Sequence, residues 1–158
     1  LDAERVPDDF DASFSAIMRY YRYKIVNRQS PLTYHSNTHA HVKQSLDISI
    51  MQQAADYFIG KHDFTTFRSA GCQSKSPIKS IEKILITEQR DKIYVDFIAK
   101  SFLHTQVRSI MGCILKVGTG SWDLSMIPDI IAAKDRAKCA TLAPSCGLYL
   151  RKIDYGCI

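Results

Sequence analysis

The sequence lacks the features that would place it outside the ordinary globular proteins. None of its apolar runs approaches the length needed to cross a bilayer, which argues against a transmembrane helix. Its 158 residues contain no internal repeat, no low-complexity tract and no linker rich in proline, glycine or serine. With 46% hydrophobic residues, they predict a single globular unit or one large piece of a bigger protein.

Cysteine is present, but not in a pattern typical of a disulfide framework or a thiolate zinc site. The five cysteines are an odd number, and no two of them form a Cys-x-x-Cys pair. They are Cys72, Cys113, Cys139, Cys146 and Cys157. Such a set favours reduced, unlinked thiols, so we expect a cytoplasmic protein.

The charge of +5 is unevenly distributed along the chain. Residues 1–16 hold five acidic residues and one base, lack an apolar stretch, and therefore do not resemble a signal peptide. The remaining residues carry 20 bases against 11 acids, a net charge of +9. An excess of this size attracts polyanions, although by itself it favours nucleic acid only modestly.

The clearest local pattern predicts an antiparallel hairpin. Residues 78–86 and 93–99 alternate apolar and polar positions on either side of the segment 89–92. This alternation directs Ile84, Ile86, Val95 and Phe97 toward a core.

Other segments predict further strands and helices. We expect strands over 20–26 and 147–154, and a helix from its cap Asp47 to about Ile59 that stops at Gly60. Apolar spacing predicts a second helix over 103–115, ending near Gly118, and a third over 125–133 with Ser125 as its cap. Residues 64–77 are predicted to form a long loop. Strands and helices intermix without a βαβ rhythm, which favours an α+β fold: a largely antiparallel mixed sheet with helices packed on it.

Two groups of residues have weak alternative interpretations as catalytic or metal sites. His35, His39 and His41 lie close together, but a polar loop or edge strand explains them better than a metal site. Cys72 and His62 are a conceivable nucleophile pair, which would make the protein a hydrolase, but the sequence does not show the hydrogen bond that activation requires.

Aromatic rings and arginines alternate in the first predicted strand. Arg19, Tyr21 and Tyr23 should share one face, and Tyr20 and Arg22 the other. A ring beside a cation can hold an unstacked base, and cross-strand aromatic packing explains the pattern equally well.

Arg108 stands on the shoulder of the apolar stripe of the second helix. There it is expected to be partly buried, and a buried arginine normally has a carboxylate partner. No partner is evident from the sequence.

Six strings that occur in one order resemble the bacterial tRNA pseudouridine synthase A family. They are Arg19-x-Tyr21-Arg22-Tyr23, Gly60-x-His62-Asp63-Phe64-x-x-Phe67-Arg68, Cys72-Gln73-x-Lys75-x-Pro77, Phe102-Leu103-His104-x-x-Val107-Arg108-x-x-x-Gly112, Ala133-x-Asp135-Arg136 and Ala143-Pro144-x-x-Gly147-Leu148-Tyr149-Leu150. The resemblance covers essentially all of residues 1–158, but only the C-terminal domain and adjoining elements of the family's full-length enzymes.

The resemblance implies a homodimeric isomerase without metal or cofactor, which converts uridine to pseudouridine in the anticodon stem-loop of tRNA, around positions 38 to 40. Tyr21 matches the tyrosine that stacks on the target uracil, and Arg108 matches the arginine that pairs with the catalytic aspartate. Further RNA contacts are predicted for the remaining basic residues of these strings and of the adjoining loop. They are Arg19, Arg22, Arg68, Lys75, Lys79 and Arg136.

One element of the family pattern is missing. The family's nucleophilic aspartate lies in a Gly-Arg-Thr-Asp-x-Gly-Val-His string, and the sequence contains neither this string nor a substitute. The chain also begins with Leu1, so we expect a truncated enzyme that is inactive alone. The competing hypothesis is an RNA-binding domain without chemistry.

Overall fold

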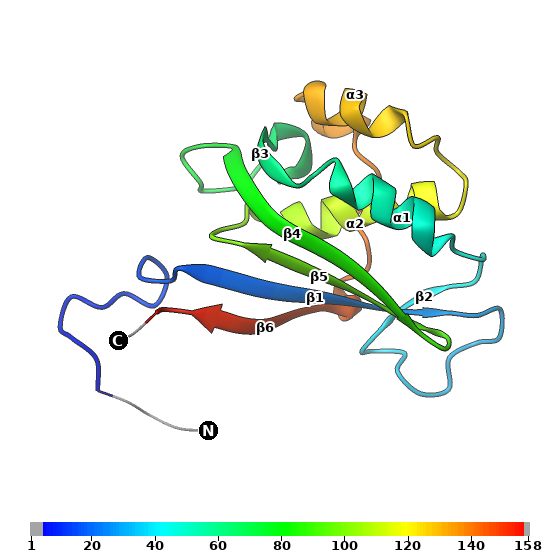
Figure 1. Ribbon diagram of the computed structural model, residues 1–158, viewed down its shortest axis with the longest axis horizontal. Helices are drawn as coiled ribbons and strands as arrows, with labels where there is room; N and C mark the ends of the chain where they lie inside the picture. Colours follow the sequence, from blue (N-terminus) through cyan, green and yellow to red (C-terminus); the bar gives the residue numbers. More distant parts are fainter. Residues whose placement is uncertain (1–4, 157–158) are drawn as a thin grey trace.

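The computed structural model describes residues 5–156, which form one mixed sheet with helices on one of its faces (Figure 1). The strands are β1 (Met18–Asn27), β2 (Ala40–Val42), β3 (Gly60–Asp63), β4 (Ile78–Gln89), β5 (Lys92–Ala99) and β6 (Leu148–Asp154). The α-helices are α1 (Ile48–Asp56), α2 (Gln106–Gly118) and α3 (Met126–Ala132). Three single-turn 3-10 helices are η1 (Thr65–Phe67), η2 (Arg136–Lys138) and η3 (Ser145–Gly147). The predicted α+β class is confirmed.

The sheet is built around β1, which pairs with three other strands. The strand order is β2-β1-β5-β4-β3, and β6 pairs with the first part of β1 along the same edge that β2 occupies further on. Only the β1–β2 pair is parallel among the strands described. The sheet is therefore largely antiparallel, as the sequence predicts.

The predicted hairpin is β4 and β5, and it is longer than expected. Its strands run to Gln89 and from Lys92, so only Arg90 and Asp91 form the turn, with Arg90 in the left-handed conformation at φ 58°. The four core residues predicted for the hairpin are all buried. A register shift between Ile81 and Lys83 marks a bulge in β4.

Helix α1 begins as its sequence predicts and ends earlier. The Asp47 carboxylate accepts a hydrogen bond from the backbone nitrogen of Ile50 at 3.0 Å, the contact of an N-terminal cap. The helix ends at Asp56 rather than near Ile59, because the chain turns and Gly60, at φ 96°, already begins β3. This short strand was missed because its glycine reads as a helix stop.

The other two helices also differ from the prediction at their starts. Helix α2 begins at Gln106, not Leu103, and ends at Gly118 as expected. Ser125 is the N-cap residue of α3 as predicted, but its side chain makes no capping hydrogen bond, and the Asp123 carboxylate accepts from the Ser125 nitrogen at 2.8 Å.

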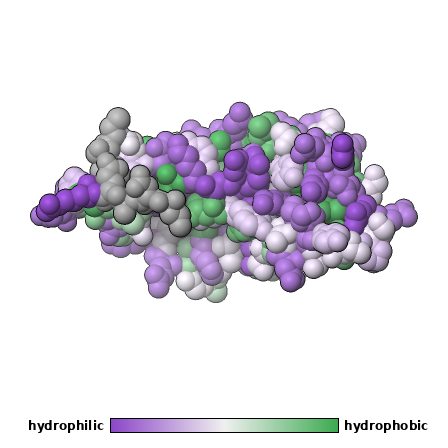
Figure 2. Space-filling view, turned by 90° about the horizontal axis from the view of Figure 1, so that it is seen from below, coloured by the Kyte–Doolittle hydropathy of each residue, from purple (hydrophilic) through white to green (hydrophobic). Residues whose placement is uncertain are grey.

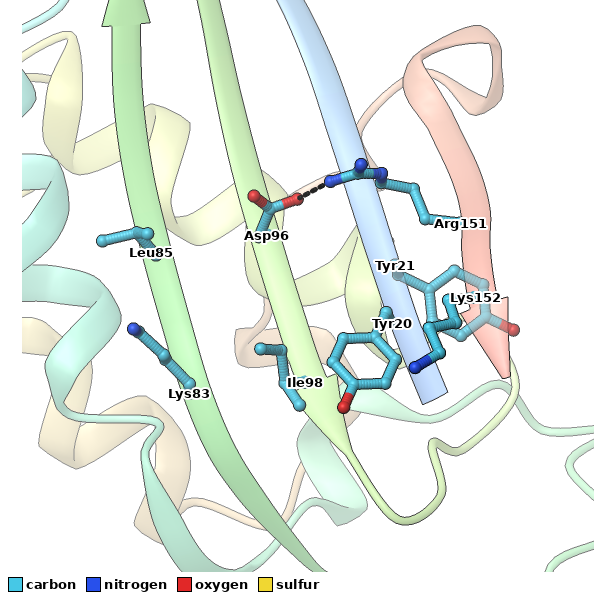
Figure 3. Close-up of a pocket in the computed structure, with 8 residues that line it drawn as sticks. All are labelled: Tyr20, Tyr21, Lys83, Leu85, Asp96, Ile98, Arg151 and Lys152. Carbon is cyan, nitrogen blue, oxygen red and sulfur yellow. Dashed lines mark ion pairs between the residues drawn. The ribbon is translucent and has the colours of Figure 1, made fainter. Parts of the chain in front are cut away.

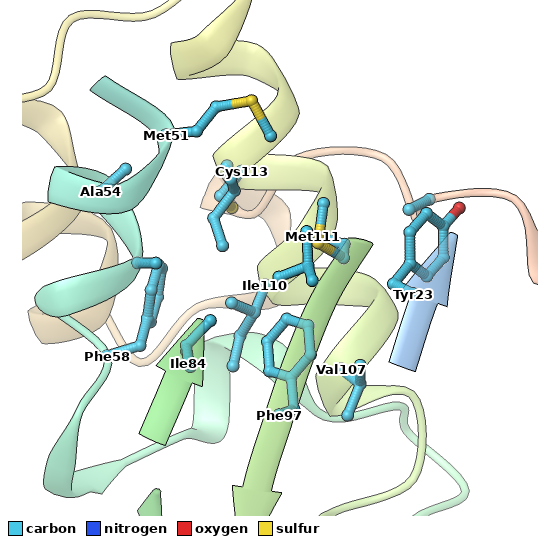
Figure 4. Packing of buried hydrophobic residues seen from close by; sticks show 14 of the residues in the cluster. Tyr23, Met51, Ala54, Phe58, Ile84, Phe97, Val107, Ile110, Met111 and Cys113 are labelled. Atoms are coloured by element: carbon cyan, nitrogen blue, oxygen red, sulfur yellow. The ribbon is translucent and has the colours of Figure 1, made fainter. Parts of the chain in front are cut away.

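The core lies between the sheet and the helices α1 and α2. Phe97 and Ile84 from the sheet meet Ile110 and Met111 of α2, and all four are fully buried (Figure 4). The two helices pack closely, since a Cβ added at Gly118 would lie 2.4 Å from the Met51 side chain. Helix α2 is thereby fixed across the sheet, and its first turn is held beside the middle of β1.

Candidate functional site

A cleft of about 390 Å³ opens where the start of α2 meets β1 and β6. Tyr21 of β1, Leu148 of β6 and Arg108 of α2 line it, together with residues 102–107, which connect β5 to α2. The half-buried Tyr21 ring is held edge-to-face against Phe102, with ring centroids 5.3 Å apart. An aromatic ring and a guanidinium group thus face one cavity.

The connection that forms the cleft has a strained backbone. Thr105 precedes α2 in the left-handed conformation at φ 69°, which a β-branched residue rarely adopts. The fully buried Gln106 stabilises the turn, since its Oε1 accepts from the Leu103 nitrogen at 2.7 Å. Strained backbone of this kind occurs preferentially at functional sites.

Arg108 is oriented by the chain segment that precedes β6. Its Nε donates to the Ala143 oxygen at 2.7 Å, and the Ala143 nitrogen donates to the Arg108 oxygen at 3.1 Å. None of the ion pairs formed within residues 5–156 includes Arg108. The guanidinium is therefore fixed in position, yet its charge is not neutralised by a carboxylate of the described chain.

Ser69 binds His104, one of the residues that line the cleft. The Ser69 nitrogen donates to the His104 oxygen at 3.2 Å, and Ser69 Oγ lies 2.7 Å from His104 Nδ1. Burial raises the pKa of the Cys72 thiol, but backbone hydrogen bonds, including one from His104, and the charges of Arg68 and Lys79 outweigh it and leave the pKa below its ordinary value. Arg68 and Lys79 thus lie close enough to Cys72 to lower its pKa, and neither residue lines the cleft.

None of the six predicted RNA-binding residues lines this cleft, and two of the arginines bind other groups of the chain. The strand alternation places Arg22 on the opposite face of β1, where its guanidinium binds Asp96 at 2.6 and 2.7 Å and lies over the Tyr94 ring. This is the face that the alternation along the first strand predicts for Arg22, so Arg22 does not belong to the tyrosine cleft. Arg19 donates to two backbone oxygens, those of Lys100 and Ser13, and so ties the segment before β1 to the end of β5.

The last two predicted RNA-binding residues lie in different surroundings. Lys75 is exposed in the loop between η1 and β4. Arg136 begins η2, where its Nη1 lies 3.5 Å from the Ala140 oxygen. Neither residue lines the cleft.

The structure gives no support to the two alternative sites. His41 lies on the short edge strand β2 and contacts the Arg28 oxygen at 2.9 Å, and no group of three potential metal ligands occurs within residues 5–156. His62 Nε2 lies 2.9 Å from the Ile59 oxygen. No hydrogen bond joins His62 to Cys72 in the described part of the chain, so the contact required for a Cys-His nucleophile is missing.

A second pocket, of about 260 Å³, lies on the helix-free face of the sheet (Figure 3). Tyr20, Ile98 and the aliphatic Leu85 line it, and Asp96 lies 3.9 Å from Arg151 there. Seen from below, the surface of the molecule is mostly hydrophilic, with small hydrophobic areas between the polar ones (Figure 2). Arg151 of this pocket thus has a carboxylate beside it, unlike Arg108.

Three contacts of the cleft were missed by sequence reasoning. Phe102 supports the tyrosine ring, the Ala143 oxygen orients Arg108, and Ser69 holds His104. Each residue stands within or next to one of the six strings, but nothing in their spacing indicates which residues touch.

The comparisons with known proteins identify the family. The model of the tRNA pseudouridine synthase family matches residues 54–156. The chain is 48% identical over 155 residues to tRNA pseudouridine synthase A of Parvibaculum lavamentivorans, covering 98% of this chain and 63% of the relative. It is 47% identical over 152 residues to the protein of the same name from Azorhizobium caulinodans, covering 96% of this chain and 59% of the relative.

The chain belongs to the tRNA pseudouridine synthase family. It spans about three fifths of the length of the curated relatives that it matches. None of the helices formed by residues 5–156 has the length and apolar content that a membrane crossing requires.

Proposed function

We propose that this chain is the C-terminal, uracil-holding portion of a tRNA pseudouridine synthase, an isomerase that acts on the anticodon stem-loop of tRNA. The observation that carries the proposal is the cleft in which Tyr21 and Arg108 face one cavity. The reaction detaches uracil from the ribose, turns the base and rejoins it through carbon. The reaction requires a site that holds the detached base, and it requires no cofactor.

Tyr21 is the proposed stacking platform. The target nucleotide is hidden in a stem or loop stack, so it must be flipped out at a cost of a few kcal/mol. Stacking on an aromatic ring recovers about 1–3 kcal/mol per base. The edge-to-face contact with Phe102 keeps the Tyr21 ring oriented before the base arrives.

Arg108 is the proposed partner of the nucleophilic aspartate. A charge-assisted pair with arginine keeps a carboxylate ionised and oriented. Arg108 is anchored through Nε to Ala143, and its terminal nitrogens make no hydrogen bond within residues 5–156, so they can serve an incoming carboxylate. The family's aspartate string is absent from the 158 residues, so we propose that the chain as given does not form pseudouridine by itself.

The proposed substrate also fits the charge of the chain. The net charge of +9 after residue 16 attracts tRNA, and Arg68, Lys75 and Lys79 are proposed to contact its phosphates. Arg19, Arg22 and Arg136 stay weaker candidates, because each is held by other groups of the chain. As in the family pattern, we propose a homodimer that works in the cytoplasm.

A fusion experiment tests the proposal. The chain is joined to the part of the Parvibaculum relative that it does not match, and pseudouridine is quantified by mass spectrometry after incubation with an unmodified tRNA transcript. The fusion is expected to form pseudouridine, and the chain alone to form none while still binding the transcript. Turnover by the chain alone would refute the role assigned to the missing aspartate. Binding without turnover by a correctly folded fusion would favour the non-catalytic RNA-binding domain.

A further inference from the structure

Two thiols that are 26 positions apart in the sequence meet where the segment after η2 packs against α2. Cys113 lies in the middle of α2 and is fully buried, and Cys139 follows η2 and is partly exposed. Their sulfur atoms are 3.8 Å apart. A disulfide needs a sulfur–sulfur distance of about 2.05 Å, so the two sulfur atoms must approach by about 1.8 Å to form one.

The backbone around this pair is already close. Cβ built on Gly112 would lie 2.2 Å from the Thr141 oxygen and 3.4 Å from the Ala140 Cβ, so the segment after Cys139 lies flush against α2. The Cys139 sulfur also lies 3.8 Å from the Ser109 oxygen, one turn before Cys113. The two cysteines therefore face each other across a tight contact.

The two thiols differ in acidity, chiefly because of the hydrogen bond between them. The hydrogen bond from Cys113 lowers the pKa of Cys139, and the Arg136 guanidinium lowers it further, against the effect of burial. The hydrogen bond to Cys139, together with burial, raises the pKa of Cys113. Cys139 is thus the more acidic and more exposed thiol, the combination that makes a cysteine reactive toward peroxide. The exposed cation of the same turn, Lys138, is not among the causes of this shift.

We propose that Cys139 and Cys113 form a peroxide-responsive thiol pair. The Cys139 thiolate attacks one oxygen of hydrogen peroxide, which breaks the O–O bond, gives a sulfenic acid and releases hydroxide. The Cys113 sulfur then attacks the sulfenic sulfur and forms the disulfide, while its proton and the hydroxyl leave as water. Peroxide is reduced by two electrons, and the two thiols supply them.

Peptide mapping is the direct test. The chain is treated with hydrogen peroxide, remaining thiols are alkylated, and trypsin is expected to release residues 109–116 and 139–151 joined by a disulfide. Because the second peptide also contains Cys146, the experiment is repeated with Cys146→Ser, which should leave the cross-link intact. A thiol reductant should reverse the reaction.

Three variants separate this pair from a mere packing contact. With Cys113→Ser, Cys139 should proceed to sulfinic acid because no resolving thiol remains. Arg136→Gln should slow the peroxide reaction about 3- to 10-fold through a smaller thiolate fraction, whereas the matched control Lys138→Gln should not. The disulfide should also raise the melting temperature of the parent chain by about 5 to 15 °C.

Several results would overturn the proposal. One is a sulfinic acid at Cys139 of the parent chain while Cys113 still reacts with the alkylating agent. Another is a disulfide that links Cys139 to a cysteine other than Cys113. A third is an equal rate of reaction with peroxide for Arg136→Gln and Lys138→Gln. The readouts involve neither tRNA nor pseudouridine, so they are independent of the proposed function.

Discussion

Replacement of Gly112 by alanine probes the contact that orients Arg108. The added Cβ would lie 2.2 Å from the Thr141 oxygen, and an ordinary contact needs about 3.4 Å, so the segment must move by about 1.2 Å. A shift of this size, passed on to Ala143, would lengthen its 2.7 Å hydrogen bond from Arg108 beyond bonding range.

The sign of the stability change shows whether the close contact at Gly112 or the helix propensity of alanine dominates. Replacing glycine with alanine inside a helix normally stabilises it by about 1 kcal/mol. Overpacking costs about 1–3 kcal/mol, and the lost hydrogen bond to a charged group about 1.5–3 kcal/mol. After the propensity gain is subtracted, we expect Gly112→Ala to destabilise the chain by about 1.5–5 kcal/mol, which lowers the melting temperature by roughly 3 to 20 °C.

Thermal unfolding followed by circular dichroism measures this change. Gly71→Ala is the matched control, because a Cβ at Gly71 meets nothing within 4 Å and its backbone is not in the left-handed region. If Gly112→Ala unfolds at or above the temperature of the control, the close contact between α2 and Thr141 is refuted.

The remaining predictions concern pH and salt. The hydrogen bond from the Thr65 hydroxyl lowers the pKa of Asp63 below its ordinary 3.8. The ionised carboxylate therefore stabilises the fold fully above pH 3.8, and this stabilisation is lost as the pH falls through the lowered pKa. Asp63→Asn should remove that acid-dependent loss of stability, which urea titrations at several pH values measure. In tRNA binding by the fusion, Lys75→Ala should make the salt slope shallower by about one-half to one unit. Tyr21→Ala should weaken binding about 5- to 150-fold at every salt concentration, and unchanged slopes and affinities for both variants would contradict the RNA assignments.

The sequence predicted the parts of the fold that depend on local patterns. The alternation around residues 89–92 was sufficient for the β4–β5 hairpin, and the Asp47 cap was sufficient for the start of α1. The start of α2 was not predictable from apolar spacing, because Leu103 is buried by the turn at Thr105 before the helix begins.

Of the candidate site, the sequence predicted only the two principal residues, Tyr21 and Arg108. Alternation along β1 also predicts that Arg22 lies on the face opposite Tyr21, away from the cleft. The contact between Arg108 and Ala143 joins residues 35 positions apart, and no local pattern encodes it. Long-range packing determines such contacts.

The most direct test of the central claim measures the reaction of the fusion when Arg108 is replaced. Single-turnover pseudouridine formation and tRNA affinity are compared for the parent fusion, Arg108→Ala and the control Arg151→Ala, an exposed arginine on the helix-free face. If Arg108 orients the nucleophile, its loss should lower the rate constant at least 100-fold with less than a 3-fold change in affinity, an effect on the transition state rather than on binding. The control should retain the parent rate. A rate near that of the parent for Arg108→Ala, or a loss of affinity as large as the loss of rate, would contradict the account.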